Sequence, residues 1–353
     1  MPSVTAVTPS VAHPSCTRCA HDGELLYADL RDRLFGVEGA WSLRRCPRCA
    51  QVWLDPQPAA SEIAGLYRDY YTHDDAGELS LFRRAVMRGI PAAVFGYADA
   101  VSDTAERVLG RCLSLVGPLR ETARHGLMWL PGERRGRLLD VGCGSGLFLE
   151  HMQALGWEVT GLEPDANAAR LAREALAPAE VVTGELQRAE LAPESFDAVT
   201  LSHVIEHLLD PDAALATCHR LLLPGGRLVL STPNSESLGV RRFGRSWLHW
   251  DPPRHLQLFN PRTLPQLVRS AGFEVESLDT STNGAHFIWL TSSMIERRGS
   301  LPGIDLSQAG VALWLQSLVY WGIEFLLTRL GKPCGEELIL VARKAPRSGM
   351  EQT

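Results

Sequence analysis

The stretch Leu138–Gly146, LLDVGCGSG, decides the fold of this 353-residue chain. Its first residues read as a short buried strand, and three glycines, Gly142, Gly144 and Gly146, then follow at alternate positions. Glycines at the carboxyl end of a strand allow a tight turn and let the backbone come close to a ligand. A dinucleotide fingerprint would carry its third glycine one position later, where Leu147 stands. The spacing therefore predicts a ligand-binding turn and disfavours NAD.

Strand and helix patterns alternate after this turn. Apolar runs that read as strands lie at 157–163, 179–184, 196–202, 227–234 and 272–278. A helix is expected over 211–226, ended by its Pro-Gly-Gly, and 336–344 reads as the last strand, at an edge of the sheet. Such alternation predicts an α/β fold with a mostly parallel, seven-stranded sheet covered by helices on both faces.

Composition divides the chain into parts. We expect a zinc-ribbon segment at 1–75, a helical linker or lid at 76–132, an α/β domain at 133–345 and a disordered tail at 346–353. A helical insertion at 285–334 precedes the last strand. Its part 311–330 has almost the length of a membrane span, but Gln316, Glu324 and Arg329 interrupt it. We expect a buried helix covering the site; the alternative is a face that docks at a membrane surface or accepts a greasy substrate.

Net charge and the first residues of the chain disfavour two classes, nucleic-acid-binding proteins and secreted proteins. The formal net charge is -6 and the pI is near 6.0, so bulk electrostatics give no reason to expect a nucleic-acid partner. The first fifteen residues have neither a basic start nor an apolar core. We therefore expect no secretory signal and a cytoplasmic location, with peripheral membrane contact through 311–330 as the alternative.

Four of the eight cysteines form two C-x-x-C pairs, Cys16 with Cys19 and Cys46 with Cys49. In a reducing compartment two such pairs predict a tetrahedral, structural zinc site rather than disulfides. A redox pair or incidental cysteines are the alternatives. The metal would replace a hydrophobic core that so short a segment cannot build.

Four segments together resemble the Rossmann-like class I methyltransferases that use S-adenosylmethionine. They are LLDVGCGSG, GLEPD at 161–165, FDAVTLSHVIEHLLDP at 196–211 and RLLLPGGRLVLSTPN at 220–234. The cofactor contacts that we expect from the motifs and the resemblance are Asp140, Gly142, Cys143, Gly144, Gly146, Glu163, Pro164, Glu185, Leu186 and Ser202. An acid such as Glu163 at the end of the second strand can accept both ribose hydroxyls. The cysteine pairs resemble those of a bacterial subgroup in glycan, lipid or secondary-metabolite pathways, and of sugar C-methyltransferases.

The stretch SHVIEHLLDP at 202–211 places His203, Glu206 and His207 at the spacing of an inverted zinc protease. Its position after the fourth strand of this fold disfavours a protease. The region resembles ubiquinone-pathway O-methyltransferases and small-RNA 2′-O-methyltransferases, in which E-x-x-E-H and a later histidine hold a metal. Glu206 and His207 match that pattern, His255 supplies the later histidine, and His203 replaces the first glutamate. The resemblance implies a divalent cation; the alternative is that the polar groups only bond to neighbouring loops.

Without a metal, His255 or His203 is the candidate base, because an unperturbed histidine titrates near neutral pH. Arg254 is expected to pair with a phosphate or carboxylate of the acceptor; the alternatives are that it pairs with Asp251 or is only solvated. We expect an S-adenosylmethionine-dependent methyltransferase that methylates a hydroxyl of a small-molecule, glycan or lipid-linked acceptor. The alternatives are C- or N-methylation of a sugar nucleotide or secondary metabolite, and a non-enzymatic S-adenosylmethionine sensor or scaffold.

Overall fold

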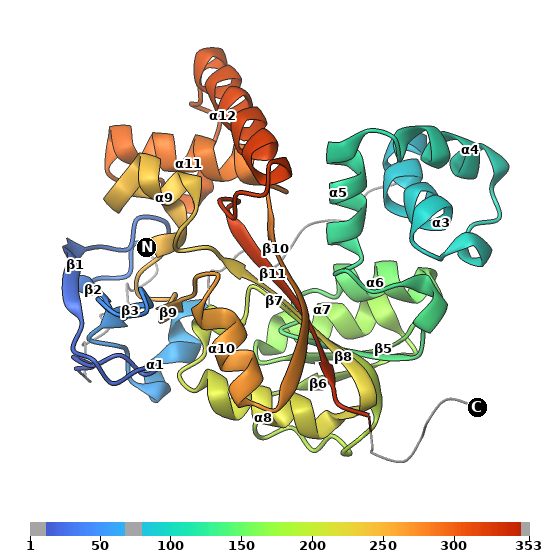
Figure 1. Ribbon diagram of the computed structural model, residues 1–353, viewed down its shortest axis with the longest axis horizontal. Helices are drawn as coiled ribbons and strands as arrows, with labels where there is room; N and C mark the ends of the chain where they lie inside the picture. Colours follow the sequence, from blue (N-terminus) through green and yellow to red (C-terminus); the bar gives the residue numbers. More distant parts are fainter. Residues whose placement is uncertain (1–11, 68–79, 347–353) are drawn as a thin grey trace.

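The computed structural model describes residues 12–67 and 80–346, which form two sheets and several helical layers (Figure 1). From residue 347 on, the tail predicted at 346–353 lies outside the described residues. The larger sheet has seven strands in the order β10-β11-β8-β7-β4-β5-β6. Their bounds are β4 (Arg137–Val141), β5 (Glu158–Glu163), β6 (Glu180–Thr183), β7 (Phe196–Ser202), β8 (Leu222–Pro233), β10 (Phe273–Ser281) and β11 (Glu337–Lys344).

The larger sheet is mostly parallel, as predicted. Neighbours among β4, β5, β6, β7 and β8 run parallel, whereas β11 is antiparallel to both β8 and β10. The prediction that the last strand lies at an edge is wrong, because β11 has partners on both sides and is buried from Glu337 to Ala342. A strand covered on both faces reads as a continuous apolar run, which explains the sequence of β11.

Helices cover both faces of this sheet. Helices α6 (Leu147–Ala154) and α7 (Ala166–Leu176) pack on one face, and α8 (Pro211–Leu221) and α10 (Thr263–Ser270) pack on the other. Successive residues of a strand point to opposite faces, so Leu138 lies in one core and Leu139 in the other. The helix predicted over 211–226 ends early, because Leu222 already pairs with Phe196 and opens β8.

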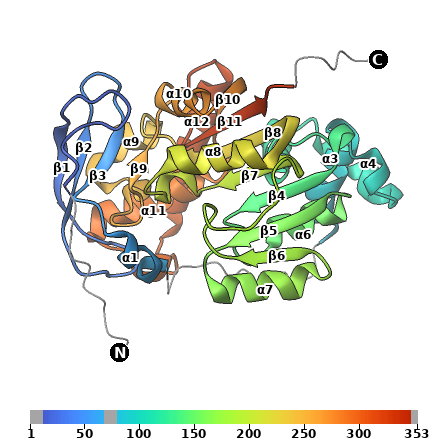
Figure 2. The same cartoon turned by 90° about the horizontal axis from the view of Figure 1, so that it is seen from below.

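The smaller sheet contains β1 (Glu24–Leu30), β2 (Trp41–Arg45), β3 (Val52–Asp55) and β9 (Gln257–Leu258) in that order. Its fourth strand therefore comes from the methyltransferase-like part of the chain. Helix α1 (Ala60–Ile63) and the 3-10 helix Ala64–Tyr67 follow β3. One apolar core joins this sheet to the segment before β9 and to the insertion, and Trp41, Trp250 and Trp289 are buried in it. Figure 2 shows the small sheet and the 81–126 helices at opposite ends of the larger sheet.

The helical segment before β4 packs at that far end. Its elements are α2 (Leu81–Arg84), a π-helical turn at Ala85–Gly89, α3 (Ile90–Val94), α4 (Thr104–Leu113), α5 (Gly117–Gly126) and 3-10 helices at Ala98–Ala100 and Gly132–Arg134. Gly89 and Gly110 allow two helical stretches to touch, since a Cβ atom at Gly110 would lie 2.2 Å from the carbonyl carbon of Gly89. Helix α5 continues toward the larger sheet, where it meets the site described below.

The predicted helical insertion before β11 is confirmed. It contains α11 (Ala285–Arg298), a 3-10 helix at Pro302–Ile304 and α12 (Val311–Arg329), and it packs beside α9 (Leu238–Phe243) (Figure 1). Further 3-10 helices lie at Ile205–His207, Gly244–Ser246 and Leu248–Trp250. Among the described helices, α12 alone has the length and hydropathy of a membrane span, yet only 17% of its apolar window is buried. The prediction that 311–330 is a buried helix is therefore wrong.

Candidate active site

The glycine turn lies where β4 ends and α6 begins. Gly142, Gly144 and Gly146 all have positive φ, at 75°, 55° and 90°, which side chains other than glycine rarely adopt. A Cβ atom at Gly142 would lie 2.6 Å from the Val204 side chain. The turn therefore needs glycine both for its backbone conformation and for its close contact with the segment after β7.

Two buried acids flank this turn. Asp140 accepts a hydrogen bond from the Thr200 hydroxyl at 2.7 Å, and burial raises its pKa to about 7. Glu163, at the end of β5, accepts hydrogen bonds from the amides of Gly144 and Asp165, each at 2.9 Å, and burial raises its pKa. Each carboxylate oxygen has two acceptor sites, so Glu163 keeps the capacity to accept ribose hydroxyls.

The other predicted cofactor contacts lie along the same edge of the sheet but differ in exposure. Pro164 and Glu185 are exposed, and Glu185 is 3.5 Å from Arg188. Ser202, the last residue of β7, is half-buried. Leu186 and Cys143 are buried, at 5% and 7% exposure, and each packs in one of the two cores. The structure thus places all of them near the carboxyl ends of the parallel strands.

His203 lies between two carboxylates. Its Nδ1 is 3.2 Å from Oε1 of Glu206, and its Nε2 is 3.1 Å from Oε1 of Glu337. Burial alone lowers the pKa of His203, but the two carboxylates outweigh it and raise the value to about 10. An imidazolium that donates through both nitrogens has no lone pair to accept a proton. The role of base predicted for His203 therefore does not fit this arrangement at neutral pH.

Glu206, His207 and His255 converge beside it. One potential ligand atom from each lies within 4.8 Å of the other two. Glu206 is fully buried; burial alone raises its pKa, but His203 outweighs burial and lowers the value to about 2. His203 is outside this group, since both of its ring nitrogens face carboxylates.

Backbone carbonyls orient the two histidines of this group. The Nδ1 of His207 lies 3.1 Å from the carbonyl oxygen of Arg254, and the Nδ1 of His255 lies 2.7 Å from that of His249. Carbonyl oxygens only accept, so each Nδ1 carries a proton, and in the neutral form of each ring the lone pair is on Nε2. A metal-binding histidine usually donates its other ring N–H to a carbonyl or carboxylate, as both of these rings do. Burial lowers the pKa of His207 to about 4, which favours the neutral, ligating form.

Arg254 is not available to an acceptor. Its guanidinium pairs with Asp251, one of the predicted partners, and also with Asp32 in the turn after β1. The Arg254 and Asp32 side chains are fully buried. The predicted pairing of Arg254 with an acidic group of the acceptor is therefore wrong, because two carboxylates already occupy the guanidinium.

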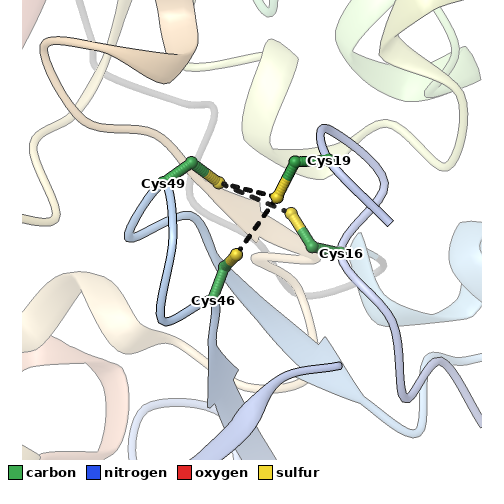
Figure 3. A group of neighbouring side chains, drawn as sticks. All are labelled: Cys16, Cys19, Cys46 and Cys49. Carbon is green, nitrogen blue, oxygen red and sulfur yellow. Dashed lines mark hydrogen bonds between the residues drawn. The ribbon is translucent and has the colours of Figure 1, made fainter. Parts of the chain in front are cut away.

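The four cysteines of the N-terminal pairs come together (Figure 3). The Sγ atoms of Cys16 and Cys49 are 3.6 Å apart, those of Cys19 and Cys46 are 3.3 Å apart, and those of Cys19 and Cys49 are 3.7 Å apart. A disulfide needs about 2.05 Å, whereas a tetrahedral zinc site with Zn–S bonds of about 2.3 Å places its sulfurs about 3.8 Å apart. The cluster therefore fits the predicted zinc segment.

Several side chains that shape the site were missed by sequence analysis. Glu337, at the start of β11, also contacts Nε2 of His125 from α5 at 3.0 Å. His249 stacks near His203 and His255, and its Nε2 is buried without a hydrogen-bond partner among the described residues. The sequence did contain a signal for Glu337, because two acids, Glu336 and Glu337, begin the apolar last strand. A cavity of about 440 Å³ lies at the amino ends of β7 and β8, outside this site.

Comparison with known proteins agrees with this geometry. Residues 118–278 match a family model described as a methyltransferase domain. A ubiquinone biosynthesis O-methyltransferase of Thiobacillus denitrificans is 33% identical over 158 residues, which are 41% of this chain and 68% of that protein. One from Xanthomonas oryzae pv. oryzae is 46% identical over 153 residues, which are 40% of this chain and 64% of that protein.

Solved structures of methyltransferases also align with the chain. Phosphoethanolamine N-methyltransferase 2 of Haemonchus contortus, in complex with S-adenosyl-L-methionine, aligns with a TM-score of 0.42 and 18% identity over 67% of this chain and 60% of that one. The glycine turn, the sheet and the sequence relatives lead to one conclusion: this chain belongs to the class I S-adenosylmethionine-dependent methyltransferases.

Proposed function

We propose that the protein transfers the methyl group of S-adenosylmethionine to a hydroxyl oxygen of a small-molecule, glycan-linked or lipid-linked acceptor. The observation that carries this proposal is the convergence of Glu206, His207 and His255 beside the glycine turn. Val204, which lies between His203 and this group in sequence, directly contacts Gly142. The relatives named ubiquinone biosynthesis O-methyltransferases support oxygen as the methylated atom.

The cofactor would be held by the turn and by the acids beside it. Close approach of the backbone at Gly142, Gly144 and Gly146 supports contact with the methionine part of the cofactor, and Glu163 would accept from the ribose hydroxyls. Methyl transfer from a sulfonium mainly requires alignment of acceptor and donor, because the leaving group is already activated. The turn therefore has to fix the donor relative to the histidines after β7 and in 249–255.

The acceptor hydroxyl must lose a proton, and His255 is the base that the geometry supports. Its Nδ1 donates to the His249 carbonyl, so Nε2 can take the proton. A base of this kind contributes roughly 10²–10⁴ in rate. The neutral ring of His249, whose pKa burial lowers to about 3, offers its unpartnered Nε2 as a hydrogen-bonding group for the acceptor.

The same residues fit a divalent cation. Glu206, His207 and His255 supply one carboxylate and two imidazoles, a donor set that suits borderline metals better than magnesium. When bound there, a cation would act as a Lewis acid on the acceptor oxygen and lower its pKa. His203 would hold the Glu206 carboxylate in place by a hydrogen bond from Nδ1.

We also propose that the four-cysteine cluster holds a structural zinc ion. The two pairs form matching knuckles: the amide of Ala20 donates to the Cys16 carbonyl at 2.8 Å, and that of Ala50 donates to the Cys46 carbonyl at 3.0 Å. Repeated knuckle geometry with four convergent thiols supports zinc over a redox pair. Elemental analysis of the purified protein should give one zinc per chain, and a metal-free, fully folded protein would refute the assignment.

Helix α12 supports an apolar or lipid-linked partner. Its only acid, Glu324, is fully buried, whereas Leu315, Val319, Leu326 and Leu330 are at least 59% exposed. On an ordinary surface helix the charged residues face water and the apolar residues are buried, which is the reverse of this arrangement. We propose that this face rests on the membrane surface from which a lipid-linked acceptor is drawn.

Labelled methyl donor and cell extract test the reaction itself. The product that gains the label should carry an O-methyl group, identified by its carbon chemical shift and by mass spectrometry. His255→Ala should abolish the transfer while S-adenosylmethionine still binds by calorimetry. Label on carbon or nitrogen, or full turnover in the variant, would refute O-methylation by this site. EDTA at a concentration that leaves the four-cysteine zinc in place separates the two versions of the mechanism, because only the cation-assisted one then loses turnover.

A further inference from the structure

The loop that carries His255 is hydrogen-bonded to the zinc segment. We refer to residues 249–260 as the 249–260 loop. The carbonyl of Leu256 accepts hydrogen bonds from the amide of Leu54 at 3.0 Å and from Nε2 of Gln57 at 3.3 Å. Asn260 donates to the carbonyl of Cys49, one of the predicted zinc ligands, at 3.0 Å. The last residue of the loop therefore contacts the cysteine knuckle that would bind zinc.

A buried ion pair forms the strongest link between the two parts. Arg254 donates to both oxygens of Asp32, at 2.8 and 2.9 Å, and both side chains are fully buried. Two parallel N–H···O bonds fix the plane and direction of the guanidinium. Asp32 is itself fixed, because its carboxylate also accepts from the amides of Leu34, Phe35 and Val37. Asp32 thus joins the turn after β1 to Arg254.

From Arg254 the linkage reaches the histidines through the backbone. The carbonyl oxygen of Arg254 accepts from Nδ1 of His207, and His255 is the next residue in the chain. The amide of Leu256 donates to the carbonyl of Glu206 at 2.8 Å. The position of the Arg254 backbone therefore sets the ring orientation of His207 and places His255 opposite Glu206.

We infer that Asp32 is a positioning residue for the acceptor side of the active site. Through Arg254 it fixes the 249–260 loop, and the loop holds His207 and His255 with their Nε2 atoms directed toward Glu206. The zinc segment would then be part of the catalytic apparatus rather than a separate binding module. The catalytic role of these histidines rests on the proposed function. The effect of Asp32 on their positions, however, can be measured without an acceptor.

The chain offers a closely matched control. Asp55 is also largely buried, with its side chain 10% exposed against 0% for Asp32, and it also pairs with an arginine, Arg44. Its hydrogen-bond partners among the described residues, Arg44 and the amide of His13, both lie within the N-terminal segment. Asp32→Asn and Asp55→Asn therefore make the same chemical change, but only the first weakens the link to the histidines.

Nuclear magnetic resonance of the full-length protein, with zinc retained and histidine labelled with nitrogen-15, tests the inference. In Asp32→Asn we expect the Nδ1–H signal of His207 to be lost or averaged, and amide exchange at Leu256 to become at least tenfold faster. Asp55→Asn should keep both wild-type values. Wild-type values in Asp32→Asn, or equal changes in both variants, would overturn the inference.

Two further measurements keep the outcome interpretable. If Asp32→Asn does not fold, Arg254→Lys keeps the charge but loses the paired hydrogen bonds, and it should produce the same changes at His207 and Leu256. Wild-type behaviour of Arg254→Lys would then overturn the inference. Calorimetric binding of S-adenosylmethionine should be the same in all the folded proteins. Failure of the wild type to bind it would defeat the proposed function, while the comparison of the variants would still stand.

Discussion

Replacing His203 by glutamine should destabilise the protein, most strongly at pH 6.5 and below. The ring donates to Glu206 and to Glu337, which are 0% and 11% exposed, so the variant leaves two buried carboxylates without their shared cation. Removing one member of a buried ion pair typically costs about 3–5 kcal/mol. Loss of the stable fold at neutral pH is therefore within reach for a domain of ordinary stability.

The pKa of His203 gives a second measure of the same effect. Its rise from 6.5 to about 10 corresponds to about 5 kcal/mol, at 1.36 kcal/mol for each pKa unit. The His203 side chain is 33% exposed, so water screens part of this interaction and we expect about 2–3 kcal/mol. Because the folded-state pKa is raised, this contribution is complete below pH 6.5 and declines as the pH rises to about 10.

Urea unfolding at pH 6.5 and pH 10.5 measures this contribution. The free energy of unfolding of His203→Gln should fall about 2–3 kcal/mol below that of the wild type at pH 6.5, and the gap should narrow at pH 10.5. His219→Gln is a suitable control, because burial lowers the pKa of His219 and no described carboxylate pairs with it. An equal gap at both pH values would refute the paired imidazolium.

Three further outcomes can be measured directly. Cys46→Ser should lose the zinc ion and destabilise the small sheet, seen as zinc content below one per chain and faster amide exchange in β2 and β3. Gly142→Ala places a methyl group 2.6 Å from Val204 in a left-handed backbone conformation, so the dissociation constant for S-adenosylmethionine should rise at least tenfold by calorimetry. Val319→Glu should reduce co-sedimentation with phosphatidylglycerol vesicles, whereas Val108→Glu, at a residue of equal exposure on α4, should not; equal loss in both would argue against α12 as the contact.

The parts of the fold that sequence predicts are those specified by local patterns. The glycine spacing at 142–146 marks a conformation that other residues rarely adopt, and the two C-x-x-C pairs carry their own knuckle geometry. Alternation of apolar strands and amphipathic helices likewise specified the parallel sheet. Each of these signals lies within a few residues of the structure that it predicts, so one sequence is enough to read it.

The rest depends on contacts between distant parts of the chain. The pKa of His203 depends on Glu337, which lies 134 residues away in the sequence. Arg254 is held by an ion pair with Asp32, which lies 222 residues away in the sequence. Sequence analysis left open whether Arg254 pairs with the acceptor or with Asp251, and it did not identify Asp32, which lies in an unremarkable turn far away in the sequence. It also expected a buried helix at 311–330, because an apolar run does not show which of its faces is covered.

The strand β9 has a practical consequence for any shortened form of the protein. A chain trimmed to the region shared with its methyltransferase relatives would lose β3 and leave the amide and carbonyl groups of Gln257 and Leu258 without their neighbour. The buried guanidinium of Arg254 would keep Asp251 but lose Asp32, its second carboxylate. Strand edges with unpaired backbone groups favour aggregation, and a buried charge that has lost its partner destabilises the fold. The smallest functional form of the protein therefore has to include the zinc segment as well as the part that carries the glycine turn.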